Sequence, residues 1–166
     1  ERRILEVLEG PELAALHAAI GFQQLEGELK RFEKQPGLTR LRTELTGIDP
    51  DEAFSQVPYE KGYLFLKALE AAAGREAFDR MLKHWLAAHR FGSATTDDFL
   101  GHLEKELPGV LARVDAQRWI DGPGLPPDAP RPKSARLAVV QAMKGRVPTP
   151  DEARGWIAAE WQLYLE

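Results

Sequence analysis

Cysteine is absent from the 166 residues of this chain, so no disulfide framework can stabilise its fold. A chain without cysteine is compatible with a reducing compartment, and we expect a cytoplasmic protein. Long apolar runs are also missing: none approaches the roughly 18 residues of a membrane-spanning helix, and no charged-then-apolar signal segment opens the chain. We therefore expect no membrane partner.

The sequence has no basic stripe. Its 22 Lys and Arg residues are scattered among 26 Asp and Glu residues, which gives a formal net charge of −4. Proteins that bind nucleic acids neutralise phosphates with clustered positive charge. Nucleic acid is therefore not an expected partner.

Motifs of metal and nucleophilic catalysis are missing as well. No H-E-x-x-H occurs, and the four histidines are dispersed. His84 and His89 are five residues apart, a spacing that does not place both on one face of a helix. There is no nucleophile elbow and no phosphate-binding loop. We expect no bound metal or cofactor in this chain.

What remains is a normal globular composition, with 43% hydrophobic and 29% charged residues. Apolar residues recur mostly at helical spacing, which predicts a mainly α fold with one principal core. The single strand candidate is the segment 40–45, which we expect to be extended. Helices are also expected at 134–144 and at 151–166, where Pro150 and the apolar face of Trp156 to Leu165 favour a helix.

A proline-rich stretch divides the chain. Residues 121–133 contain five prolines, which forbid a regular helix or a central strand. We expect this stretch to be an exposed, stiff linker.

The most informative local pattern is V-P-Y-E-K-G at residues 57–62 and the apolar helix that follows it. Pro58 fits the first turn of a helix, and Gly74 supplies the positive φ angle that ends it. Tyr59 then lies in the first turn, where free N–H groups and the helix dipole favour negative charge. With its ring packed by Val57 and Pro58, the phenol is a candidate donor to a developing oxyanion. The alternative is an amphipathic core-edge tyrosine.

The run D-P-D-E-A-F-S-Q-V-P-Y-E-K-G, residues 49–62, resembles zinc aminopeptidases of the leukotriene A(4) hydrolase and aminopeptidase B type, in the gluzincin family. Further similar segments follow in the family's order, at residues 1–4, 95–99 and 123–127. The resemblance implies the helical back half of a thermolysin-like catalytic domain that hydrolyses peptides with Zn²⁺. It also implies that Tyr59 stabilises the tetrahedral intermediate.

The same resemblance implies the residues of a substrate pocket. Asp51 matches an aspartate that lines the substrate cavity, although locally it also reads as a capping or turn carboxylate. Phe54 replaces a tyrosine that contacts lipid in leukotriene A(4) hydrolase, and Thr43 replaces an apolar pocket residue. The expected substrate-binding residues are Pro50, Asp51, Ala53 and Phe54.

The chain begins without methionine and stops inside an expected helix, so we expect it to be a fragment. The resemblance places the zinc ligands and the general base upstream, in the missing half of the catalytic domain. It assigns residues 1–120 to that domain, 121–133 to the linker and 134–166 to the opening of a helical C-terminal domain. The isolated chain is then expected to be inactive. The alternative is a non-enzymatic helical module that binds a peptide.

Overall fold

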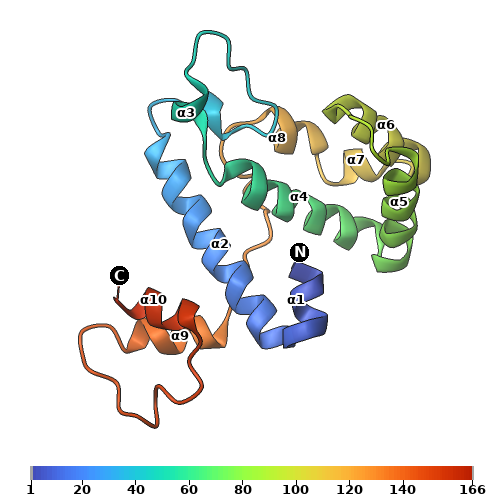
Figure 1. Ribbon diagram of the computed structural model, residues 1–166. Coiled ribbons are helices and arrows are strands. Elements are labelled where there is room, and N and C mark those ends of the chain that lie inside the picture. The colour runs from blue at the N-terminus through green and yellow to red at the C-terminus, as the bar shows by residue number, and fades with distance from the viewer. Residues whose placement is uncertain (1, 166) are drawn as a thin grey trace. The chain divides into compact units, whose positions relative to one another are not determined.

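The computed structural model describes residues 2–165, and all regular elements of this range are helices (Figure 1). The predicted mainly α fold is confirmed. The chain divides into two compact units. The smaller unit comprises Glu1–Gln24 and Arg131–Glu166, and the larger unit comprises Leu25–Pro130. Helix α2, Pro11–Arg31, contributes residues to both units.

The larger unit is built on α4, the helix that carries Tyr59. Its elements after α2 are η1 (Pro36–Thr39), α3 (Pro50–Ala53), α4 (Val57–Ala73), α5 (Arg75–Ala88), α6 (Thr96–Glu106), α7 (Val110–Arg113) and α8 (Ala116–Asp121). Helix α4 packs against α5 and α7, and α6 packs against α5 and α7. The rings of Phe65 and Trp119 lie 5.8 Å apart in the core between α4 and α8.

Helix α4 begins and ends where the sequence predicts. Pro58 lies in its first turn, and Gly74 follows it with φ of 82°. The buried face of α4 is not purely apolar. Phe65 and Leu69 are buried, whereas Leu66 is 37% exposed, and the charged residues Lys61 and Glu70 are buried.

The expected extended segment at 40–45 is wrong, because it forms no strand in the described structure. No neighbouring strand exists there to complete a ladder. The backbone N–H groups of Leu41 and Arg42 both donate to the Ile120 carbonyl oxygen, at 3.1 and 3.0 Å. The Arg42 guanidinium also binds Asp97 through both terminal nitrogens and Asp121 through Nε. These contacts fix an irregular segment.

The start of α6 is a capping box formed by Thr95 and Asp98. The Thr95 hydroxyl accepts from the Asp98 N–H, and the Asp98 carboxylate accepts from the Thr95 N–H at 2.8 Å. This reciprocal capping box satisfies two helix-terminal donors. The other carboxylate of the first turn, that of Asp97, accepts hydrogen bonds from the Arg42 guanidinium.

The smaller unit has α1 (Arg2–Glu9), the first part of α2, α9 (Ala135–Ala142) and α10 (Ala158–Leu165). Its core contains Leu16, Ala19 and Leu137, packed by Leu13, Ile20, Ile157 and Leu163. Ser134 caps α9 by accepting from the Leu137 N–H. The helix expected from residue 151 begins only at Ala158, because Gly155 adopts φ of 81° and turns precede it.

A buried ion pair joins α9 to α10. Arg136 Nε donates to Glu160 Oε1 at 2.8 Å, and a second guanidinium nitrogen reaches Oε2. The Glu160 side chain is 2% exposed, and its carboxylate also accepts from the Ile157 N–H at 2.8 Å. Burial alone would raise the pKa of Glu160, but these hydrogen bonds hold the pKa below its ordinary value.

The stretch 121–133 is less exposed than its prolines suggest. Pro126 and Ala129 are buried. The Gly124 N–H donates to the Thr39 hydroxyl at 2.7 Å, and the Gly122 carbonyl oxygen accepts from Lys61. The start of the stretch is therefore held by side chains of η1 and α4, which satisfy its backbone groups, while six of its 13 residues are exposed as expected.

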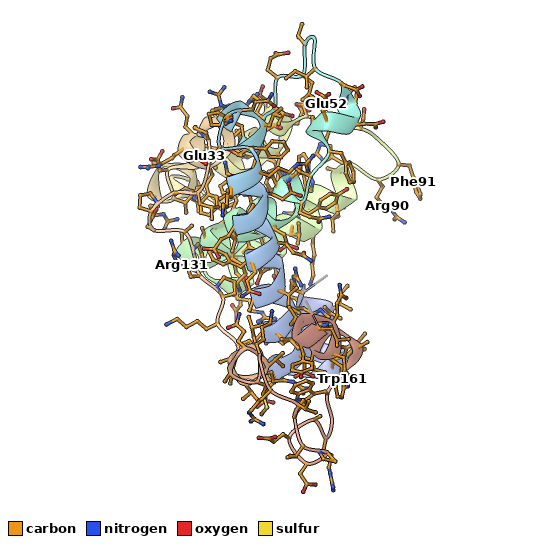
Figure 2. All side chains as sticks on the ribbon, turned by 90° about the vertical axis from the view of Figure 1, so that its left-hand side faces the viewer. Glu33, Glu52, Arg90, Phe91, Arg131 and Trp161 are labelled. Carbon is orange, nitrogen blue, oxygen red and sulfur yellow. The ribbon has the colours of Figure 1, made fainter. Side chains whose placement is uncertain are left out.

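We expect trypsin to cleave this chain first at exposed loop residues and not near the start of the proline-rich stretch. Arg90 and Phe91 project from the loop after α5 (Figure 2), and Phe91 is fully exposed. Lys144 lies in the exposed turn after α9. Early peptides should end at Arg90 and Lys144, and the matched site Arg118, within α8, should be cut late. Mass spectrometry over a digestion time course measures this order, and earlier cleavage at Arg118 would contradict the packing of the larger unit.

Candidate functional site

Tyr59 is the third residue of α4, and its side chain points into solvent rather than into a packed site. It is 63% exposed, and Pro58 is exposed beside it. The expected packing of its ring by Val57 and Pro58 is therefore wrong, because Val57 is itself fully buried in the helix base. An exposed phenol at the start of a helix is accessible to a ligand.

Four of the predicted site residues lie on or beside α3, which precedes Tyr59. Asp49, not Asp51, caps this short helix by accepting from the Asp51 N–H at 2.9 Å. The capping role considered for Asp51 is therefore wrong. The Asp51 side chain is exposed. Phe54 ends the helix with a side chain 67% exposed, and its carbonyl oxygen accepts from Arg31 at 3.4 Å. Pro50 and Ala53 belong to α3 itself.

A cavity of about 480 Å³ opens next to α3 in the larger unit. Glu52, which projects from α3 (Figure 2), is one of the residues that line it. The full lining consists of Gln35, Pro36, Gly37, Leu38, Arg40, Glu44, Gly47, Ile48 and Glu52. The predicted residues Pro50, Asp51, Ala53, Phe54 and Tyr59 are not part of this wall. The structure thus places the cavity beside the predicted pocket segment.

The cavity wall carries both signs of charge. Arg40 provides a guanidinium, and Glu44 and Glu52 provide carboxylates. The Thr46 hydroxyl and N–H both donate to the Glu44 carboxylate and hold its pKa below the ordinary value. Such a wall can bind polar or charged groups as well as the apolar surface of Leu38 and Ile48.

Lys61 is the residue of this region that sequence reasoning missed. It is completely buried, and its ammonium donates to the Thr39 carbonyl oxygen at 2.9 Å and to the Gly122 carbonyl oxygen at 2.8 Å. Burial, and then the nearby positive charge of Arg40, lower the pKa of Lys61 to about 8. A usable signal was present: Lys61 is four residues after Val57, on the buried face of the same helix.

No three His, Cys, Asp or Glu side chains among residues 2–165 are placed to hold a metal ion. His84 Nδ1 pairs with the Glu106 carboxylate at 2.8 Å. The His89 ring lies against Trp85, and His102 Nε2 lies 3.2 Å from the Met81 carbonyl oxygen. The donors in this part of the chain thus do not fit a catalytic zinc, which needs three protein ligands.

Within the described range, no helix is long and apolar enough to cross a membrane.

Comparison with known proteins gives the family. Residues 22–119 match the Peptidase family M1 domain. Leucine aminopeptidase 2 of Sclerotinia sclerotiorum is 32% identical over 177 aligned residues, which cover 100% of this chain and 29% of that protein. The leukotriene A-4 hydrolase homolog of Botryotinia fuckeliana is also 32% identical, over 100% of this chain and 27% of its own length.

Solved structures agree with these relatives. Yeast LTA4 hydrolase in complex with bestatin superposes with a TM-score of 0.84 at 28% identity, over 99% of this chain and 29% of that chain. Native leukotriene A4 hydrolase from Saccharomyces cerevisiae gives a TM-score of 0.81 at 29% identity, with the same coverage. This chain spans less than a third of the length of these proteins. The helical fold, the V-P-Y-E-K-G helix and the match over residues 22–119 together show that the chain belongs to peptidase family M1.

Proposed function

We propose that this chain is part of a zinc metalloaminopeptidase that removes N-terminal residues from peptides. The observation that carries the proposal is the exposed Tyr59 at the start of α4, within the V-P-Y-E-K-G run of a family M1 chain. The names of its relatives, leucine aminopeptidase 2 and leukotriene A-4 hydrolase homolog, support the same class of reaction.

In this proposal Tyr59 is the catalytic residue of the chain. Hydrolysis of a peptide bond places negative charge on the carbonyl oxygen as the carbon becomes tetrahedral. A phenol O–H aimed at this oxygen donates a hydrogen bond that is strongest when the charge has developed. The exposure of Tyr59 leaves its hydroxyl accessible to a substrate carbonyl.

Residues of the α3 segment shape the pocket for the first side chain of the peptide. Asp51 and Phe54 have exposed side chains, and Pro50 and Ala53 set the course of the backbone. The cavity lined by residues 35–38, Arg40 and Glu52 lies beside this region and offers both charged and apolar surface. We propose that part of the substrate binds there.

The zinc ligands belong to a part of the protein outside this chain, since residues 2–165 offer no fitting group. This chain therefore contributes the substrate pocket and Tyr59 to an active site that residues outside the chain complete. The domain assignment 1–120, 121–133 and 134–166 and a cytoplasmic location are proposals of the same kind.

The test uses the full-length protein that contains this chain. We expect it to hydrolyse an aminoacyl anilide, to lose activity on dialysis against a chelator and to regain it with one equivalent of Zn²⁺. The 166-residue chain alone is the matched control and should give no hydrolysis. If the full-length protein binds peptides but does not hydrolyse them in the presence of zinc, the proposed enzymatic function is wrong and a helical peptide-binding module is the better description.

A further inference from the structure

Lys61 joins three segments of the larger unit that are far apart in sequence. It lies on α4, two residues after Tyr59, and its two carbonyl acceptors belong to η1 and to the stretch after α8. The acceptor residues are 22 and 61 positions away from it. No carboxylate is among these partners, so the ammonium serves as a donor to backbone and not as half of an ion pair.

Thr39 completes this junction. Its hydroxyl donates to the Pro36 carbonyl oxygen at 2.6 Å and accepts from the Gly124 N–H at 2.7 Å. Thr39 is only 2% exposed, so its part of the junction is buried. Removal of the Lys61 ammonium would take the donor from the Gly122 carbonyl group and from that of the buried Thr39, which is costly.

The junction connects the two parts of the proposed site. Leu38 and Arg40, which flank Thr39, both line the 480 Å³ cavity. The Tyr59 ring is largely exposed, so packing does little to fix it, and its position follows from the backbone of α4. Lys61 is the buried group that binds this helix to the cavity wall.

We propose that Lys61 is a positioning residue, which holds Tyr59 at a fixed distance from the cavity wall at residues 36–38 and Arg40. This inference rests on the proposed function, because it requires Tyr59 to contact the reacting carbonyl. Catalysis depends steeply on such placement, and a shift of about 1 Å from a remote change can cost about 10²-fold in rate.

The test is a double-mutant cycle in the full-length enzyme with Lys61→Met and Tyr59→Phe. K61M should lower kcat by about 10- to 100-fold with little change in KM. In the Y59F background, the same substitution should lower kcat by less than about threefold, because there is no longer a hydroxyl to position. Leu103→Ala, a fully buried change on α6, is the control for lost stability and should leave kcat of the folded enzyme unchanged.

The outcomes separate the two proposals. If Y59F leaves kcat unchanged, the proposed role of Tyr59 fails and the inference fails with it. If Y59F is slow but K61M retains kcat, or if K61M costs the same in both backgrounds, only the positioning role is overturned. Should K61M not fold, Thr39→Val loosens the same junction by removing the hydroxyl bonds, and the same criteria apply to it.

Discussion

Tyr59→Phe in the full-length enzyme is expected to lower kcat by about 10²- to 10³-fold, which corresponds to roughly 2.7 to 4 kcal/mol of transition-state stabilisation. The substitution removes one hydroxyl from a side chain that is mostly exposed, so packing is hardly changed. A donor that acts only on the developing oxyanion contributes nothing to ground-state binding. KM should therefore stay within about threefold, and zinc content and melting temperature should not change.

Tyr63→Phe is the matched control, since Tyr63 lies one turn further along the same helix. Steady-state kinetics on an aminoacyl anilide and a melting curve for each variant are sufficient. If Tyr59 were only a core-edge tyrosine, Y59F would show a stability loss of about 1 kcal/mol with normal turnover. A kcat within about threefold of the parent enzyme would remove Tyr59 from the active site.

Arg136→Met is expected to destabilise the smaller unit by about 3 kcal/mol, because it leaves the Glu160 carboxylate buried without its counter-ion. In the 166-residue chain, the loss should appear as a lower denaturant midpoint and as faster amide exchange in α9 and α10. The helices of the larger unit should keep their protection. Arg154→Met is the control: Arg154 and Asp151 form a pair with both side chains about four-fifths exposed, and its loss should not move the midpoint.

The same pair predicts a pH dependence. The folded state lowers the pKa of Glu160 below its ordinary value of 4.5, so its contribution is present above that pH and is lost as the pH falls. The difference in unfolding free energy between the parent chain and R136M should therefore shrink below about pH 4.5. A constant difference down to pH 3 would show that Arg136 stabilises the unit by packing alone.

Sequence reasoning predicted the features that depend on local chemistry. The bounds of helix α4 follow from Pro58 and Gly74. These signals lie within a few residues of the structure they specify. The identity of the family followed from motifs that the comparisons later matched over residues 22–119.

The errors arose where distant segments decide the outcome. The spacing of Lys61 from Val57 indicates its helix face, but the carbonyl groups that satisfy the buried ammonium belong to residues 22 and 61 positions away, and no local pattern specifies them. The irregular course of 40–45 depends on Ile120, Asp97 and Asp121. The exposure of Tyr59 depends on which neighbours cover it, and helical periodicity specifies the face of a residue but not its neighbours.

Because Arg42 contacts both Asp97 and Asp121, we expect the residues at positions 42, 97 and 121 to vary together among related proteins. A guanidinium can bind Asp97 through two nitrogens and Asp121 through a third at the same time, whereas an ammonium is a single point charge. Lysine at position 42 is therefore not a conservative replacement. In an alignment of family M1 chains, loss of the arginine should coincide with loss of one of the two aspartates. Covariation of these positions would then identify the irregular segment, which has no periodic sequence pattern.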